Sequence, residues 1–420
     1  MNTSREIAKR DSWKTTAMPE ARARLPFSRR FTTEEHQQPS RSDMPLASSA
    51  KQISLSELRA LRMRAQCLAP RLPRKALVEV VRTLCGVQAQ LPSAMALALR
   101  ARVKDLSIED IETSRVEDRA LVRTWCMRGS MHLLAAEDVD WLLSAITPAV
   151  LRSGWRWLEK RGGLERERAS TILDEAHKTL QENGPMTRRD LMTAVAKRHG
   201  AKVMPAAAGV VWLNGMLGRV GFGPDHGAEP TYVALEVWLG RKVKVSKKPD
   251  HVELARRYLR GYGPAEPHDL AAWWELPLTD AKEAWALLHK ELAELHVEGQ
   301  PAWLLSSESA ALADASRQGR TVRLLPAFDT YLLGYHARDF AVPPTYQNRV
   351  FHGGQLVPIV LVDGCAAGTW RYEQRGQQIR IKVTPFSSFT SEVRDLIAEE
   401  ASDVGRFFGR VATLSFTKGG

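Results

Sequence analysis

The chain has 420 residues, of which 44% are hydrophobic and 26% are charged. It is therefore long enough for about three folded units, and its composition excludes a wholly disordered protein. Lysine and arginine together (60) outnumber aspartate and glutamate (48), for a net charge of +12, which favours a polyanionic partner such as nucleic acid.

The cysteines and the apolar stretches exclude further classes of protein. The four cysteines form no CxxC pair, so we expect no zinc or iron–sulfur site and no other cofactor. The longest uncharged stretches, 83–99 and 203–218, contain proline and polar amides, so we expect no membrane-spanning helix. No apolar segment follows the basic residues of the N-terminus, which argues against a secretory signal and predicts a cytoplasmic protein.

Residues 1–50 are polar and carry more basic than acidic side chains. We expect them to form a disordered basic arm. Residues 51–160 then predict a first folded unit. Ser54 and Glu57 have the spacing of a helix capping box, and Pro73 precedes a second helical stretch. The segment 124–134 has strand composition around a glycine, and helices followed by a hairpin predict a winged helix-turn-helix.

Residues 161–245 and 246–315 predict second and third winged-helix units, because six positions recur at an offset of 79 residues. In both copies a helix ends at Gly-Pro, and Asp-Leu follows where the next helix begins. The first copy contains Ala176, Leu180, Gly184, Pro185, Asp190 and Leu191, and the second contains Ala255, Leu259, Gly263, Pro264, Asp269 and Leu270.

Residues 316–420 change to a period of two, which is typical of strands. A helical stretch at 391–408 precedes a closing strand at 411–416. We expect this part to be a small β-barrel or a curled sheet. The predicted fold class is thus mainly α with β (α+β), with tandem winged helix-turn-helix units followed by a C-terminal small β-barrel.

Gln88 and Gln90 are the most informative polar residues, because they lie inside the longest uncharged stretch of the chain. Gly86 before them and Pro92 after them indicate that the backbone here is not continuous helix. Residues two apart in an extended segment point to the same side, so both amides can face one site. A buried amide without a partner costs about 1–3 kcal/mol, so the pair needs backbone, water or a ligand. A purely structural pair is the alternative.

Three segments together resemble the AlkZ-like (YcaQ-like) winged-helix DNA glycosylase family. They are Val87-Gln-Ala-Gln90, the hairpin that runs from Arg123 to Leu133, and Leu324-Leu-Pro-Ala-Phe-Asp-Thr-Tyr-Leu-Leu-Gly334. The resemblance implies three winged-helix units and a C-terminal β-barrel around a DNA channel. It also implies excision of alkylated purines, with Gln88 and Gln90 at the positions of the family's Gln-x-Gln motif. The implied partner is double-stranded DNA that contains alkylated bases.

The chemistry suits two neutral amides. Alkylation at N7 or N3 makes a purine cationic and a good leaving group, and the sugar passes through an oxocarbenium-like state. Two amides can hold the attacking water, and their carbonyl dipoles favour the developing positive charge. No lysine stands beside the pair in the sequence, so we expect a monofunctional enzyme without Schiff-base chemistry.

DNA binding is expected from basic side chains in and between the units, since such groups position DNA through its phosphates. A solvated linker remains the alternative for the basic run 241–248, and a plain turn residue remains the alternative for Arg128. With His132 of the hairpin, the predicted DNA-binding residues are Arg123, Arg128, Arg188, Arg189, Lys247 and Lys248.

Two other functions remain possible at this point. The units can belong to a winged-helix transcriptional regulator without enzymatic activity, or to a catalytically silent scaffold. Single-domain regulators usually dimerise on symmetric sites, whereas this chain has no heptad repeat or separate effector segment. We therefore favour a monomer that surrounds one non-palindromic duplex, with no obligate protein partner.

Overall fold

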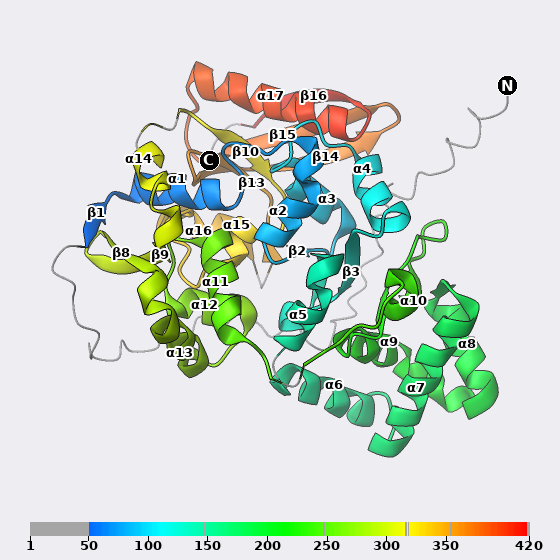
Figure 1. The fold of residues 1–420 in the computed structure, drawn as a ribbon. Helices are drawn as coiled ribbons and strands as arrows, with labels where there is room; N and C mark the ends of the chain where they lie inside the picture. The colour runs from blue at the N-terminus through cyan, green and yellow to red at the C-terminus, as the bar shows by residue number, and fades with distance from the viewer. Residues whose placement is uncertain are drawn as a thin grey trace.

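The computed structural model describes residues 50–417 apart from 147, 247, 316, 318, 353 and 354. The expected N-terminal arm lies outside these residues, except for Ala50. The described chain is a mixed α and β protein (Figure 1). In the part of the chain that is described, no helix is both long and apolar enough to cross a membrane.

The first part of the chain begins as its sequence predicts. Ser54 caps α1 and forms a capping box with Glu57, and a 3-10 turn at Arg74–Ala76 leads into α2. The elements are β1 (Lys51–Ile53), α1 (Leu55–Ala65), α2 (Leu77–Thr83), β2 (Val87–Gln88), α3 (Pro92–Arg100), α4 (Ile108–Glu112), β3 (Leu121–Trp125), β4 (Met131–Ala135), α5 (Val139–Ser144) and α6 (Pro148–Lys160).

The two predicted repeats follow, and their matching residues occupy matching places. Asp190 and Asp269 both stand at the third position of the second helix of their copy, where each helps to cap the helix. The elements are α7 (Arg166–Asn183), β5 (Met186–Thr187), α8 (Arg188–His199), α9 (Ala207–Met216), β6 (Val220–Phe222), β7 (Thr231–Ala234), α10 (Leu235–Leu239), α11 (His251–Tyr262), α12 (Pro267–Trp274), α13 (Leu278–Leu288), β8 (Leu292–Val297), β9 (Gln300–Leu305) and α14 (Ala311–Ala315).

Each of the first three parts has the same chain order: a helix, a short extended segment, two helices and a hairpin. The short segment pairs with the last strand of the hairpin, as β2 does with β4 and β5 with β7. In the third part, Ala265 alone forms this bridge, to Trp303 of β9. The first two hairpins also pair with each other, so that β2-β4-β3-β6-β7-β5 is one sheet. The three parts are therefore joined through shared sheets and helix packing.

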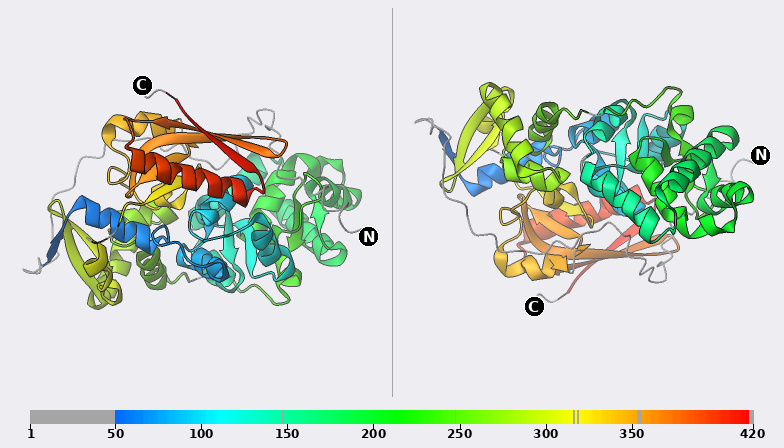
Figure 2. Two further views of the ribbon diagram at one scale, coloured as in Figure 1. Left: turned by 90° about the horizontal axis from the view of Figure 1, so that it is seen from above. Right: turned by 90° about the horizontal axis from the view of Figure 1, so that it is seen from below.

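The C-terminal part is an open five-stranded sheet in the order β10-β13-β14-β15-β16. The expected closed barrel is wrong for the described strands, because β10 and β16 lie at opposite edges. The reason is α17, which connects β15 to a parallel β16 and packs along one face of the sheet (Figure 2). The elements are β10 (Val322–Leu325), α15 (Thr330–Leu333), α16 (Gln347–Val350), β11 (Phe351–His352), β12 (Gln355–Leu356), β13 (Ile359–Val362), β14 (Cys365–Arg375), β15 (Gln378–Pro385), α17 (Ser391–Phe407) and β16 (Val411–Phe416).

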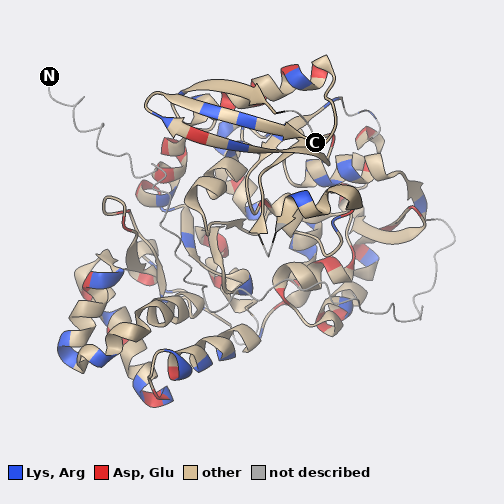
Figure 3. Ribbon diagram, turned by 180° about the vertical axis from the view of Figure 1, so that it is seen from behind, with Lys and Arg blue, Asp and Glu red and all other residues tan. Residues whose placement is uncertain are grey.

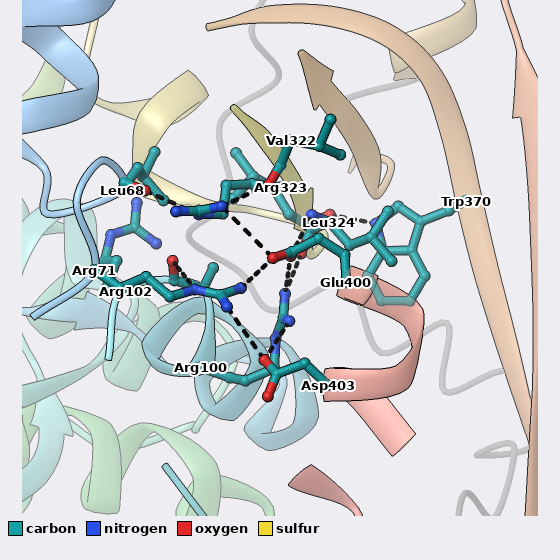
Figure 4. Close-up of polar contacts among 12 residues, drawn as sticks. Leu68, Arg71, Arg100, Arg102, Val322, Arg323, Leu324, Trp370, Glu400 and Asp403 are labelled. Carbon is teal, nitrogen blue, oxygen red and sulfur yellow. Dashed lines mark hydrogen bonds and ion pairs between the residues drawn. The ribbon is translucent and has the colours of Figure 1, made fainter. Parts of the chain in front are cut away.

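A buried cluster of charges attaches this C-terminal part to the first part (Figure 4). Glu400 of α17 accepts hydrogen bonds from Arg71 at 2.6 Å and from Arg100 at 3.0 Å. Asp403, one turn later, accepts from Arg100 at 2.9 Å, and Arg323 lies 3.6 Å from Glu400. Burial alone would raise the pKa of Glu400, but the surrounding arginines outweigh it and the pKa is lowered. Since buried charges need partners, this cluster holds the end of α3 against α17.

A second buried ion pair explains part of the Leu324–Gly334 segment. Arg102 binds both carboxylate oxygens of Asp329, at 2.7 and 2.9 Å. The same guanidinium group donates to Gln66 and to Thr330. Arg102 and Asp329 are almost fully buried, and Asp329 also caps α15. Because these buried polar groups hydrogen-bond to one another, they fix the segment against the first part of the chain.

Candidate active site at the Gln88–His132 strand pair

The Gln-x-Gln segment is a short extended stretch between two helices. The chain leaves α2 through Cys85 and Gly86, which have φ angles of 51° and 105°. A Cβ atom at Gly86 would lie 2.6 Å from the Leu134 side chain, so glycine is needed there. Pro92 then occupies the first turn of α3. The expectation of a non-helical backbone at Gln88 is confirmed.

This segment pairs with the last strand of the first hairpin. Gln88 lies directly opposite His132 in the β2–β4 ladder, and Thr124 of β3 lies opposite His132 on its other side. The Ala89 amide then donates to the Met131 carbonyl at 2.8 Å, which continues the extended path toward Gln90. Directly opposite residues of an antiparallel pair share one face. Gln88, His132 and Thr124 therefore form one row across three strands.

The side-chain oxygen of Gln88 is an acceptor that needs a donor. Its Oε1 atom is buried and has no hydrogen-bond partner among the residues that the structure describes. Such an atom costs about 1–3 kcal/mol when it stays unsatisfied. Gln90, two residues on, is half-buried. A small molecule that donates hydrogen bonds, such as water, would relieve this cost.

His132, the ladder partner of Gln88, is neutral. Its side chain is buried, and its Nδ1 lies 3.0 Å from the Ser130 carbonyl. Because a carbonyl only accepts, Nδ1 carries the proton and Nε2 carries the lone pair. Burial, followed by the nearby charge of Arg128, lowers the pKa of His132 to about 3. The ring therefore presents an acceptor and carries no charge at neutral pH.

Arg128 places a half-buried cation beside His132. It lies in the turn between β3 and β4 with a left-handed φ of 55°. Its guanidinium group donates to the Trp273 carbonyl at the end of α12. Burial lowers the pKa of Arg128 to about 10, which still leaves the group charged at neutral pH. The side chain thus ties the first hairpin to the third part of the chain.

Arg123 does not share the face on which Gln88, His132 and Thr124 lie. Arg123 points in the opposite direction from Thr124 along β3, because successive strand residues point to opposite faces. Its guanidinium carbon lies 4.4 Å from the Phe222 ring centroid, and its Nη2 lies 3.6 Å from the Met131 sulfur. Burial lowers the pKa of Arg123 to about 10. Its predicted role as a DNA contact would need this buried guanidinium group to move.

The other predicted DNA-binding residues lie outside the site. Arg188 and Arg189 are exposed in the first turn of α8, which lies at the outer end of the second part (Figure 1). Lys248 is exposed in the segment before α11, and Lys247 lies outside the described residues. Phosphate contact by Arg188, Arg189 and Lys248 stays a prediction.

Residues that support the Gln segment from the third part were missed in the sequence. Tyr262 donates its hydroxyl to the Leu84 carbonyl at 3.0 Å. A Cβ atom at Gly261 would lie 2.2 Å from the Thr83 carbonyl, so α11 packs directly on the end of α2. The Gly-Tyr-Gly run at 261–263 was the available signal, since glycine often marks close backbone approach.

Among the described residues, no group of three or more His, Cys, Asp and Glu side chains could hold a metal ion. The polar groups of the site are instead two amides, a neutral imidazole and a half-buried guanidinium. This set can position a water molecule and accept its protons in hydrogen bonds, but it offers no strong base.

Comparisons with known proteins agree on one family. A family model described as "DNA glycosylase AlkZ-like" matches residues 81–407. The chain is 29% identical over 364 residues to an interstrand DNA cross-link repair glycosylase of Streptomyces sahachiroi, across 83% of this chain and 95% of that protein. It is similar in fold to the solved structure of the S. sahachiroi DNA glycosylase AlkZ, with a TM-score of 0.70 and 24% identity over 87% of this chain and 100% of that one.

Proposed function

Since the chain belongs to the AlkZ-like DNA glycosylase family and is a DNA glycosylase, we propose that it hydrolyses the N-glycosidic bond of N7- or N3-alkylated purines in duplex DNA. Gln88 and Gln90 hold the attacking water. The observation that carries this proposal is the buried Oε1 atom of Gln88, which has no partner among the described residues and lies on the strand opposite His132.

Water can supply the hydrogen-bond donor that Gln88 Oε1 lacks among the described residues. It can donate one hydrogen bond to Gln88 Oε1 and another to a second acceptor, either the Gln90 amide oxygen or the Nε2 lone pair of His132. The Gln side-chain NH2 groups can in turn donate to the water oxygen. A water held in this way has its own lone pair directed at the sugar carbon, which supplies the positioning part of the rate enhancement.

A weak set of groups suffices because the leaving group is already activated. An N7- or N3-alkylpurine carries a positive charge, and it departs as a neutral base while positive charge develops on the sugar. The carbonyl dipoles of the two amides favour that charge. Neither Thr124 nor His132, the neighbours of Gln88 in the sheet, can form a Schiff base. This favours direct hydrolysis and a monofunctional enzyme.

We propose that the three repeated parts are winged-helix units, with boundaries near 51–160, 161–245 and 246–315, and that 316–420 is a separate C-terminal unit. Their shared order of helices and short strands supports this division. Exposed Arg188, Arg189 and Lys248 contact DNA phosphates in this proposal. The enzyme works as a cytoplasmic monomer on chromosomal DNA.

A second candidate substrate is an interstrand cross-link between alkylated purines. It is favoured by the S. sahachiroi relative, which is named as an interstrand DNA cross-link repair glycosylase. The match covers 95% of that protein and 83% of this chain. The bond to be broken is the same N-glycosidic bond. The two substrates therefore differ in how much of the opposite strand the protein must accommodate.

The direct test uses a duplex with one N7-methylguanine at a defined position. We expect release of the free base and an abasic site without added metal or nucleotide. A second duplex carries one N7–N7 guanine cross-link, which separates the two substrate classes. No base release from either duplex, together with sharp preference for one undamaged operator sequence, would favour a regulator.

A further inference from the structure

The C-terminal sheet has an outward face that the candidate active site does not use. In β14 and β15 alternate residues such as Trp370 and Ile381 are buried in the core. The residues between them point to the opposite face. In Figure 3 the ribbon of these two strands is blue at several places, where lysine and arginine residues lie. The charged residues of this face are Arg371, Glu373, Arg375, Arg380 and Lys382.

Two of these cations face each other across the ladder. Arg371 is the direct partner of Lys382, and Glu373 is the direct partner of Arg380. Like charges in directly opposite positions destabilise a sheet. Glu373 lies within ion-pairing distance of Arg375, at 3.5 Å. Neither Arg371 nor Lys382 forms a salt bridge with a described carboxylate. An arrangement that costs stability is expected where an anion binds.

Two hydroxyl side chains lie on the strand next to Arg380 and Lys382. Thr413 and Ser415 of β16 are the partners of Arg380 and Lys382 in the β15–β16 ladder, and both are exposed. Lysine and arginine beside serine and threonine is the combination with which proteins contact DNA phosphates. The face thus combines charge and hydrogen-bond donors along neighbouring strands.

The same strand touches the start of α3, directly after the Gln segment. Tyr372 points inward between the outward Arg371 and Glu373. Burial raises the pKa of Tyr372, and a hydrogen bond with the Ser93 side chain opposes that shift. Ser93 lies three residues after Gln90. The covered side of β14 therefore packs on the start of α3, and the outward face is left open to a partner.

We propose that the outward face of β14–β16 binds the sugar–phosphate backbone of duplex DNA. This proposal rests on the family's action on DNA, and it does not depend on whether Gln88 and Gln90 hold water. Duplex DNA presents a negative charge every ~1.7 Å along its axis. Arg371 and Lys382, which have no carboxylate partner among the described residues, then neutralise one phosphate each. An acidic protein or RNA is the competing occupant.

The test uses the Arg371→Gln/Lys382→Gln double variant of the full chain. The affinity for an undamaged duplex is measured between about 50 and 200 mM salt. Because two phosphates are no longer neutralised, the log–log slope should become shallower by about 1.8, and binding should weaken about tenfold near physiological salt.

Two matched variants serve as controls. Lys282→Gln/Lys290→Gln removes the same charge from exposed positions in and after α13, which Figure 1 shows away from the C-terminal sheet, and its slope should equal that of the wild type. The Arg371→Lys/Lys382→Arg exchange keeps both charges and should keep the wild-type slope. If the Arg371→Gln/Lys382→Gln variant and the Lys282→Gln/Lys290→Gln variant have the same salt slope, the proposal is overturned. Binding of RNA or an acidic protein to the face would not rescue it. The water-holding role of Gln88 is tested separately, because wild-type base release by the Gln88→Ala variant would contradict that role without affecting these slopes.

Discussion

Gln88 and His132 face each other as direct partners across the β2–β4 ladder, and the glutamine oxygen there is buried without a partner among the described residues. The imidazole of His132 is kept neutral by burial and by Arg128. Two neutral acceptors can hold water here, and the charged Arg128 guanidinium lies beside the imidazole. The hairpin residue and the Gln-x-Gln motif thus form one unit, although 43 residues separate them in the chain.

Replacing Gln88 or Gln90 by alanine should slow base release. We expect a loss of about 10²–10³-fold in the single-turnover rate, or about 3–4 kcal/mol, as for removal of one preorganised hydrogen-bonding group. DNA affinity should barely change, because neither amide carries charge. The measurement is release of N7-methylguanine from a defined duplex under single-turnover conditions.

The control for this series is Gln300→Ala, which removes an exposed amide at the start of β9. It should leave both rate and affinity as they are. Wild-type rates in the Gln88→Ala/Gln90→Ala double variant would remove the water-holding role from this pair.

His132 should make the fold sensitive to mild acid. Its pKa is lowered to about 3 in the folded protein, against about 6.5 in the unfolded chain. The unfolded state therefore binds a proton first, and stability should fall as the pH drops from about 6.5 toward 3. The slope contributed by this residue is up to about 1.4 kcal/mol for each pH unit.

The measurement is the urea-unfolding free energy at several pH values between 7 and 5, where few carboxylates titrate. His132→Gln should flatten this dependence, whereas His226→Gln, at an exposed position, should not. A pH dependence that is the same in all three proteins would mean that His132 is protonated in the folded state.

The basic run before α11 should contribute to DNA binding through charge alone. Neutralising Lys247 and Lys248 together should make the log–log salt slope shallower by about 0.9 for each phosphate that these lysines neutralise in the wild type. Binding to damaged and undamaged duplexes should weaken by the same factor, since phosphate contacts carry no lesion information. An unchanged salt slope would indicate that residues 241–248 are a solvated linker that does not contact DNA.

Lys382→Glu should separate stability from DNA binding on the outward sheet face. It replaces a like-charge pair opposite Arg371 with an ion pair, so the free energy of unfolding should rise by about 0.2–1 kcal/mol. Affinity for duplex DNA should fall at the same time. Denaturant unfolding and salt-dependent binding, compared with Lys290→Glu, measure the two effects. A variant that is both less stable and unchanged in binding would contradict the assignment.

Local signals in the sequence anticipated most of the elements. The capping box at Ser54 and Glu57 starts α1, and the alternating pattern of residues 378–383 is β15. Gly86 and Pro92 bracket an extended Gln segment as expected. Each of these features depends on residues that are neighbours in the chain. Capping, backbone restriction and side-chain periodicity act over a few residues, so they can be recognised without knowledge of the fold.

Only the tertiary structure decided how these elements meet. Nothing local tells that the first two hairpins join in one sheet, that α17 leaves the C-terminal sheet open, or that Arg123 turns toward Phe222 while His132 turns toward Gln88. A shift of one residue in strand register would exchange the two faces and move Arg123 into the site. Register is set by contacts between distant segments, because the buried face of each strand is defined by the elements that cover it. The sequence by itself thus determined the elements and the Gln-x-Gln motif, and tertiary packing determined the partners of that motif.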